Sequence, residues 1–250
     1  MPDVLSEALA LPGLGWMLLT VIVAGLVRGF SGFGSAMIIM PVASTVFSPV
    51  GAIIFLTTVE LFGPLPNLRS ALHNGTRPDV ARLALGAVFA MPLGVFALAH
   101  MSPQIFSWAV SVVVLGLLVV LMLGWRYHGS LTPPMVLGTG ALGGFLSGSI
   151  GVAGPPVIML YMASTLPISA IRANFLLYLL MIDGLMLGLF WVLGLFQLEP
   201  AIAGLVLTVP YMMANRMGAA LFNPQSERVF RAVAYSIIAA SALLGLPVWS

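Results

Sequence analysis

The chain is a series of apolar segments separated by short polar stretches. A helix that crosses the hydrocarbon core of a bilayer needs about 20 mainly apolar residues, within a range of about 17–25. Two apolar stretches, 14–47 and 135–165, are longer than this and are interrupted by glycine-rich sequence, so we expect each to be a pair of short helices. Six segments have the length of one crossing and are predicted to be transmembrane helices: 49–66, 83–99, 104–124, 173–193, 201–222 and 229–247.

The two interrupted stretches occupy matching places in the chain. Residues 25–32 align with residues 144–151 at an offset of 119, and both begin with glycine, repeat it four residues later and end on it. Matches that keep their order at a nearly constant offset indicate an internal duplication. The sequence therefore predicts two related halves, 1–130 and 131–250, each with one broken segment and three transmembrane helices.

The distribution of arginine predicts the topology, because arginine-rich loops stay in the cytoplasm. The loops at 67–82 and 223–231 carry arginine, whereas the turns at 100–103 and 194–200 carry none. Six crossings satisfy this pattern if both broken segments return to the side from which they enter. Each half then crosses three times, and the second half is inverted relative to the first, as in many secondary transporters. The alternative is that the broken segments cross fully, which gives eight crossings and parallel repeats.

Composition supports a membrane protein and excludes other classes. Only 6% of the residues are Asp, Glu, Lys or Arg, 60% are hydrophobic, and the mean hydropathy is +1.13. Soluble domains have about 45–50% apolar residues, and this chain has too few charges to cover a wetted surface. It is predicted to be an all-α integral membrane protein surrounded by lipid. A soluble enzyme, a nucleic-acid binder and a disordered chain are excluded. No metal-ligand cluster, nucleotide-binding loop or cysteine occurs, so no cofactor or metal is expected.

The two glycine-rich breaks are the first candidates for a binding site. Unpaired backbone groups in hydrocarbon each cost several kcal/mol, unless they are buried in protein or line a cavity. A helix that starts after a break presents free N–H groups, which favour an anion. In the alternative reading, the glycines only let helices pack closely. The residues predicted to line an anion site here are Ser31, Gly32, Gly34, Ser35, Ser147, Ser149, Gly151 and Gly154.

Further candidates for the binding site are Arg28, beside the first break, and four polar residues near the ends of apolar segments. Arg28 can pair with an anionic substrate, and it can do so through two parallel N–H···O hydrogen bonds if the substrate is an oxyanion. The alternative places Arg28 at the membrane interface. Arg172 with Asn174, and Asn215 with Arg216, lie near the cytoplasmic ends of their helices. A topological role explains these two arginines equally well.

Two acidic residues, Glu60 and Asp183, fall inside predicted transmembrane helices. A carboxylate in this environment must pair with a cation or bind a proton. Both are therefore candidates for coupling transport to protons. The alternative is a structural ion pair that holds helices together.

The glycine-rich sequences resemble the signatures of a known family. Residues 25–41, GLVRGFSGFGSAMIIMP, resemble the first signature of the TauE/SafE sulfite exporter family, and residues 144–156, GFLSGSIGVAGPP, resemble the second. Arg172-Ala173-Asn174 resembles the stretch that follows. The resemblance covers about residues 14–247. Ala153 and Pro155 stand where the family more often has glycine, which bears on substrate choice.

The resemblance implies a carrier in the cytoplasmic membrane of a bacterium, with sulfite, sulfoacetate or other organosulfonates as substrates. We expect a secondary transporter that works by alternating access and takes a small anion, with protons as a second candidate partner. An anion channel and a membrane assembly partner that does not transport are the two alternatives.

Overall fold

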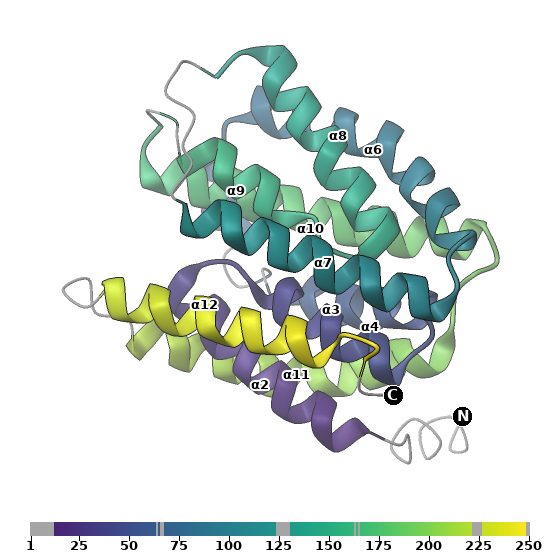
Figure 1. Cartoon of the computed structure of the whole chain (residues 1–250). Coiled ribbons are helices and arrows are strands. Elements are labelled where there is room, and N and C mark those ends of the chain that lie inside the picture. Colours follow the sequence, from purple (N-terminus) through teal and green to yellow (C-terminus); the bar gives the residue numbers. More distant parts are fainter. Residues whose placement is uncertain are drawn as a thin grey trace.

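The computed structural model describes residues 13–63, 65, 68–123, 131–162, 164, 166–221 and 227–248. Within these ranges the regular elements are eleven α-helices, which confirms the all-helical prediction. They form a bundle of roughly parallel and antiparallel rods (Figure 1). The helices are α2 (Leu14–Ser31), α3 (Ser35–Val46), α4 (Pro49–Leu61), α5 (Leu68–Asn74), α6 (Arg77–Ala99), α7 (Pro103–Met122), α8 (Pro133–Ile150), α9 (Gly154–Met162), α10 (Ile168–Val192), α11 (Leu198–Leu221) and α12 (Glu227–Leu244).

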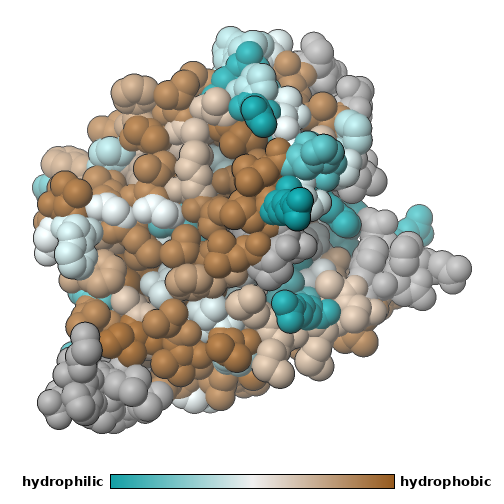
Figure 2. Space-filling view, turned by 180° about the vertical axis from the view of Figure 1, so that it is seen from behind, coloured by the Kyte–Doolittle hydropathy of each residue, from teal (hydrophilic) through white to brown (hydrophobic). Residues whose placement is uncertain are grey.

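The helices present an apolar surface outward. Four of those described, α2, α6, α7 and α10, are long and apolar enough to cross a membrane. Phe89 on α6 is 76% exposed and Val192 on α10 is 81% exposed. Brown, hydrophobic residues cover most of the face in Figure 2, and hydrophilic residues gather toward one edge. Exposed apolar area of this extent fits a lipid surrounding. The protein is a multi-pass membrane protein.

Both predicted breaks are present at the expected places. α2 ends at Ser31 and α3 begins at Ser35, while α8 ends at Ile150 and α9 begins at Gly154. Gly32 and Gly151 cap the preceding helices with φ angles of 81° and 76°. Side chains are strongly disfavoured in this left-handed region, so glycine is needed at both positions. These two glycines are at matching positions of the predicted duplication, and the chain has similar backbone angles at each.

The first broken segment folds back on itself. A Cβ atom built on Gly13, at the start of α2, would lie 3.1 Å from Val46 at the end of α3. The Ser48 hydroxyl, which caps α4 just after this point, donates to Gln197 Oε1 at 3.0 Å. Residues 13, 46–48 and 197 therefore lie together at one end of the bundle.

The opposite end of the bundle carries several arginines. The Asn174 side chain on α10 accepts a hydrogen bond from the backbone N–H of Thr76 at 2.6 Å. Two arginines flank this hydrogen bond: Arg77 follows Thr76 and begins α6, and Arg172 lies two residues before Asn174. Both arginines are exposed. The polar loops of this end match the arginine-rich side that the sequence predicts.

The predicted helix 49–66 is shorter in the structure, because α4 ends at Leu61 after 13 residues. Pro64 and Pro66 follow, and proline lacks the N–H that would continue a helix. The predicted loop 67–82 is also corrected: it contains α5 and the first turn of α6, which begins at Arg77 instead of residue 83. Hydropathy misses this turn because Arg77, Asp79 and Arg82 are polar.

Two close helix pairs hold the bundle together, and each joins the two halves of the chain. α8 packs on α6, and α2 packs on α11; α6 and α8 run side by side at the edge of the bundle in Figure 1. Glycines four residues apart line both contacts, where small residues let backbones approach. A Cβ on any of them would overlap the partner's backbone: Gly140, Gly144 and Gly148 against α6, Gly86 and Gly94 against α8, Gly25 and Gly29 against α11, and Gly218 against α2. We call these contacts the α6–α8 seam and the α2–α11 seam.

Candidate functional site

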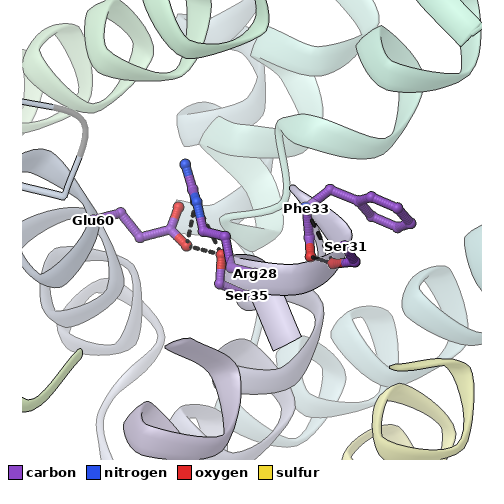
Figure 3. A network of polar contacts seen from close by, with 5 residues as sticks. All are labelled: Arg28, Ser31, Phe33, Ser35 and Glu60. Carbon is purple, nitrogen blue, oxygen red and sulfur yellow. Dashed lines mark hydrogen bonds and ion pairs between the residues drawn. The ribbon is translucent and has the colours of Figure 1, made fainter. Parts of the chain in front are cut away.

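A buried polar cluster lies at the first break. Arg28 comes from the last turn of α2, Ser35 from the first turn of α3, and Glu60 from the last turn of α4. Arg28 Nη1 lies 3.0 Å from Glu60 Oε1 and donates to Ser35 Oγ at 2.9 Å. The Ser35 hydroxyl in turn donates to Glu60 Oε1 (Figure 3). The Arg28 and Glu60 side chains are only 13% and 5% exposed. The cluster is thus a buried ion pair joined by one hydroxyl.

The geometry of the break creates this cluster. Gly32 and Gly34 both have positive φ, at 81° and 96°, and they turn the chain so that α3 starts beside the end of α2. Ser31 Oγ closes the turn, since it lies 2.7 Å from the carbonyl oxygens of both Val27 and Phe33. Figure 3 shows the Ser31 and Phe33 contacts to one side of the ion pair. Ser31 therefore shapes the break.

The cluster faces a small cavity that both breaks line. The predicted site residues around it are, from the first half, Arg28, Gly34, Ser35 and Glu60 and, from the second, Ser147, Gly151, Gly154 and Asp183. The cavity has a volume of about 20 Å³, which is about enough for one water molecule. A sulfur oxyanion is larger, so the cavity in this conformation is too small to hold one.

Asp183 on α10 supplies a second carboxyl group to the cavity. The residue is 8% exposed, and its Oδ2 is buried without a hydrogen-bond partner in the described part of the chain. Arg28 is the one basic residue among the cavity-lining residues, which therefore hold two carboxyl groups and a single cation. Much of the remaining lining is apolar, including Phe33, Met37, Leu56, Phe175 and Leu179.

The other predicted site residues lie outside the cavity lining. The Ser149 hydroxyl donates to the carbonyl oxygen of Phe145 in its own helix at 2.8 Å. The Asn174 side chain accepts a hydrogen bond from the Thr76 N–H, just before α6. The backbone carbonyl of Asn215 belongs to the α2–α11 seam, opposite Gly29. The remaining three, Gly32, Arg172 and Arg216, are exposed.

Three buried tyrosines were not singled out by the sequence reasoning. Tyr161, Tyr178 and Tyr211 are at most 1% exposed. The hydroxyls of Tyr161 and Tyr211 have no hydrogen-bond partner in the described residues, and Tyr211 lies within electrostatic range of Arg28 and Glu60. A signal was present, because the chain has only five tyrosines and four of them, these three and Tyr235, lie in apolar segments.

The family comparison agrees with this architecture. The model of the family described as sulfite exporter TauE/SafE matches residues 17–244, a range that contains both breaks and the whole cavity lining. No curated protein and no solved structure matches the chain. Members of this family are membrane transporters of the sulfite exporter type, and they are not enzymes. This chain belongs to the TauE/SafE sulfite exporter family.

Proposed function

We propose that the protein is a secondary transporter that moves small sulfur-containing oxyanions across the cytoplasmic membrane of a bacterium. Sulfite, sulfoacetate and other organosulfonates are the proposed substrates. The observation that carries the proposal is the small cavity at which the two breaks meet, with one largely buried arginine in its lining. Buried charges in membrane proteins mark substrate and ion pathways.

Arg28 is the proposed anion ligand. Within the described residues, Nη1 makes both the hydrogen bond of the guanidinium to Ser35 and its ion pair with Glu60, which leaves Nε and Nη2 for a ligand. Figure 3 shows one guanidinium nitrogen directed away from Ser35. A planar guanidinium matches two oxygens of an oxyanion, as in sulfonate or sulfite.

The start of α3 supplies further donors. The first intrahelical bond at this end is donated by Ile38 N to Gly34 O. The N–H groups of Ser35, Ala36 and Met37 therefore have no partner inside the helix, and all three residues line the cavity. α9 offers fewer donors at the matching place, since Pro155 and Pro156 lack N–H groups. We propose that the anion is held mainly by Arg28 and the start of α3.

Alternating access is the proposed mechanism, with halves 1–130 and 131–250 as inverted repeats. The reciprocal packing supports this symmetry, because α2 packs on α11 as its counterpart α8 packs on α6. Movement of the α2–α11 seam relative to the α6–α8 seam would open the cavity to one side and then to the other.

Binding by the purified protein tests the site. The panel is sulfite, sulfoacetate, taurine, sulfate and acetate, with thermal stabilisation as the measurement. We expect a sulfur oxyanion to stabilise the wild type, and the stabilisation to disappear in Arg28→Ala and to weaken in Arg28→Lys, which keeps the charge without the planar fork. Arg172→Ala, at an exposed arginine, is the matched control. Undiminished binding by Arg28→Ala would remove Arg28 from the site.

Reconstitution tests the mechanism. In proteoliposomes we expect saturable uptake and counterflow of the stabilising anion. Single-channel currents would instead support an anion channel. A protein that binds no anion of the panel, yet copurifies with one membrane partner, would support the assembly role.

A further inference from the structure

The charges around the cavity balance only if one carboxyl group is neutral. Arg28 contacts Glu60 directly at 3.0 Å, and this pair is electrically neutral. Asp183 has a buried oxygen without a partner and lines the same largely apolar cavity. An ionised carboxylate in such a place, with no cation of its own, is strongly disfavoured. A protonated, neutral Asp183 restores the balance of charge in this conformation.

The groups around Glu60 leave Arg28 as its source of positive charge. Of the elements packed on α4, α3 contributes Ser35, α10 contributes Asp183 and α11 contributes Tyr211. Neither the hydroxyls nor a protonated carboxyl group can neutralise a carboxylate. Arg28, from α2, is the single basic residue that lines the cavity.

A bound oxyanion disturbs this balance. The anion adds at least one negative charge beside Arg28, and one guanidinium cannot neutralise both the anion and Glu60. Asp183 is already neutral, so Glu60 is the group whose charge a proton can remove. We infer that Glu60 binds one proton with each anion, so that the protein carries an anion and a proton together. This inference rests on the proposed function and adds the proton as the second substrate of the same site.

The proton step balances simply. A proton from the water on the entry side adds to a Glu60 carboxylate oxygen as Arg28 turns to the anion, and it leaves to water on the exit side when the anion departs and Arg28 pairs with Glu60 again. No other bond forms or breaks. For a monovalent anion the loaded site moves no net charge. A pH gradient then drives transport, and the membrane potential does not.

Linkage makes the proton measurable in binding experiments. Sulfoacetate is the probe, because its sulfonate and carboxylate stay ionised near neutral pH. If one proton is taken up with it, its affinity for the wild type rises about tenfold for each unit by which the pH falls, as long as Glu60 is ionised in the free protein. Calorimetry in two buffers with different ionisation enthalpies counts the proton directly.

Three variants assign the proton to one residue. Glu60→Gln should bind sulfoacetate without proton uptake and with no dependence on pH. Asp183→Asn should still take up one proton, whatever its affinity, because Asp183 is neutral already. Glu199→Gln, at an exposed acid on α11, should match the wild type. Proton uptake that persists in Glu60→Gln, or that disappears in Asp183→Asn, would overturn the assignment.

A measurement on the wild type covers the case in which a variant does not fold. Sulfoacetate carries two negative charges, so with one proton it still moves one negative charge, and the membrane potential is clamped at zero in this experiment. In proteoliposomes that contain a pH indicator, an inward sulfoacetate gradient should then acidify the lumen. Sulfoacetate flux without acidification would refute the proton inference and leave the proposed function intact. Failure of every anion in the panel to bind or to be transported would refute the proposed function itself.

Discussion

The glycines of the α6–α8 seam offer a stringent test of the fold, because α8 contains a matched control. Gly140 faces α6, and a Cβ there would lie 2.6 Å from Leu83 Cα and 2.8 Å from Leu83 C. Gly138, two residues earlier in the same helix, has nothing within 4 Å of the equivalent position. The perturbation is therefore Gly140→Ala compared with Gly138→Ala.

The expected difference follows from these contacts. Carbon atoms pack at about 3.5–4.0 Å, so Gly140→Ala must separate the two backbones by about 1 Å, and a gap of that size forfeits up to about half of the attraction at each contact. Forcing a methyl group into a close contact costs about 1–3 kcal/mol. At Gly138 the methyl group has room, and alanine favours the helix by up to about 1 kcal/mol. We expect Gly140→Ala to lower the free energy of unfolding by about 1–3 kcal/mol, and Gly138→Ala to leave it unchanged or raise it.

Equilibrium unfolding in mixed detergent micelles, with an increasing fraction of sodium dodecyl sulfate, measures the difference through circular dichroism. Both variants should retain the helical signal at low denaturant. Equal stability of the two variants would refute the reasoning, because it would mean that α6 and α8 do not approach as closely as the structure shows. Gly94→Ala on the opposite side of the same seam should behave like Gly140→Ala.

Three further predictions concern the ion pair, a helix junction and the topology. Arg28→Ala should destabilise the protein by about 3–5 kcal/mol, because it leaves the buried Glu60 carboxylate without its cation and with the Ser35 hydroxyl as its remaining partner in the cluster. Arg28→Ala/Glu60→Gln should recover most of this loss, and a double-mutant cycle with no coupling would contradict the pair. Asn174→Ala should cost about 1–3 kcal/mol, because the Thr76 N–H loses its acceptor, whereas the control Asn74→Ala, at an exposed residue, should cost little; equal thermal stability of the two would argue against the bond. A reporter that is active only outside the cytoplasm should be active when it is fused after Ser250. A reporter at this position that lies in the cytoplasm would rule out the inverted arrangement.

The breaks could be predicted from the sequence because their cause is local. Gly32 and Gly151 adopt φ angles that other residues avoid, and clusters of glycine inside apolar sequence announce such turns. The end of α4 at Leu61 comes earlier than the predicted end at residue 66. Pro64 and Pro66 follow in the sequence, and an average of hydropathy over the segment does not register that proline disfavours a helix. The start of α6 at Arg77 was missed because the beginning of this helix is polar, so its average hydropathy is too low to be predicted as part of a transmembrane helix.

The partners inside the site could not be predicted in the same way. The places of Arg28 and Glu60 in apolar segments make both of them candidates, yet they form an ion pair only because α3 and α11 each pack on both α2 and α4 and bring the two side chains together. Asn174 was chosen as a site residue, and its partner Thr76 lies 98 positions away. Spacing along one helix identifies a face, such as Gly140 and Gly144, but it does not name the helix that will cover that face.

The crossed seams also constrain how the protein is made. α2 is synthesised well before its partner α11, because the helices from α3 to α10 lie between them in the chain. Until then the glycine face of α2 has lipid in place of the backbone for which it is shaped. A chain interrupted between the halves leaves both α2 and α6 without their seam partners. Each seam takes one helix from each half of the chain. Two separately synthesised halves can therefore complete their packing only by meeting in the bilayer.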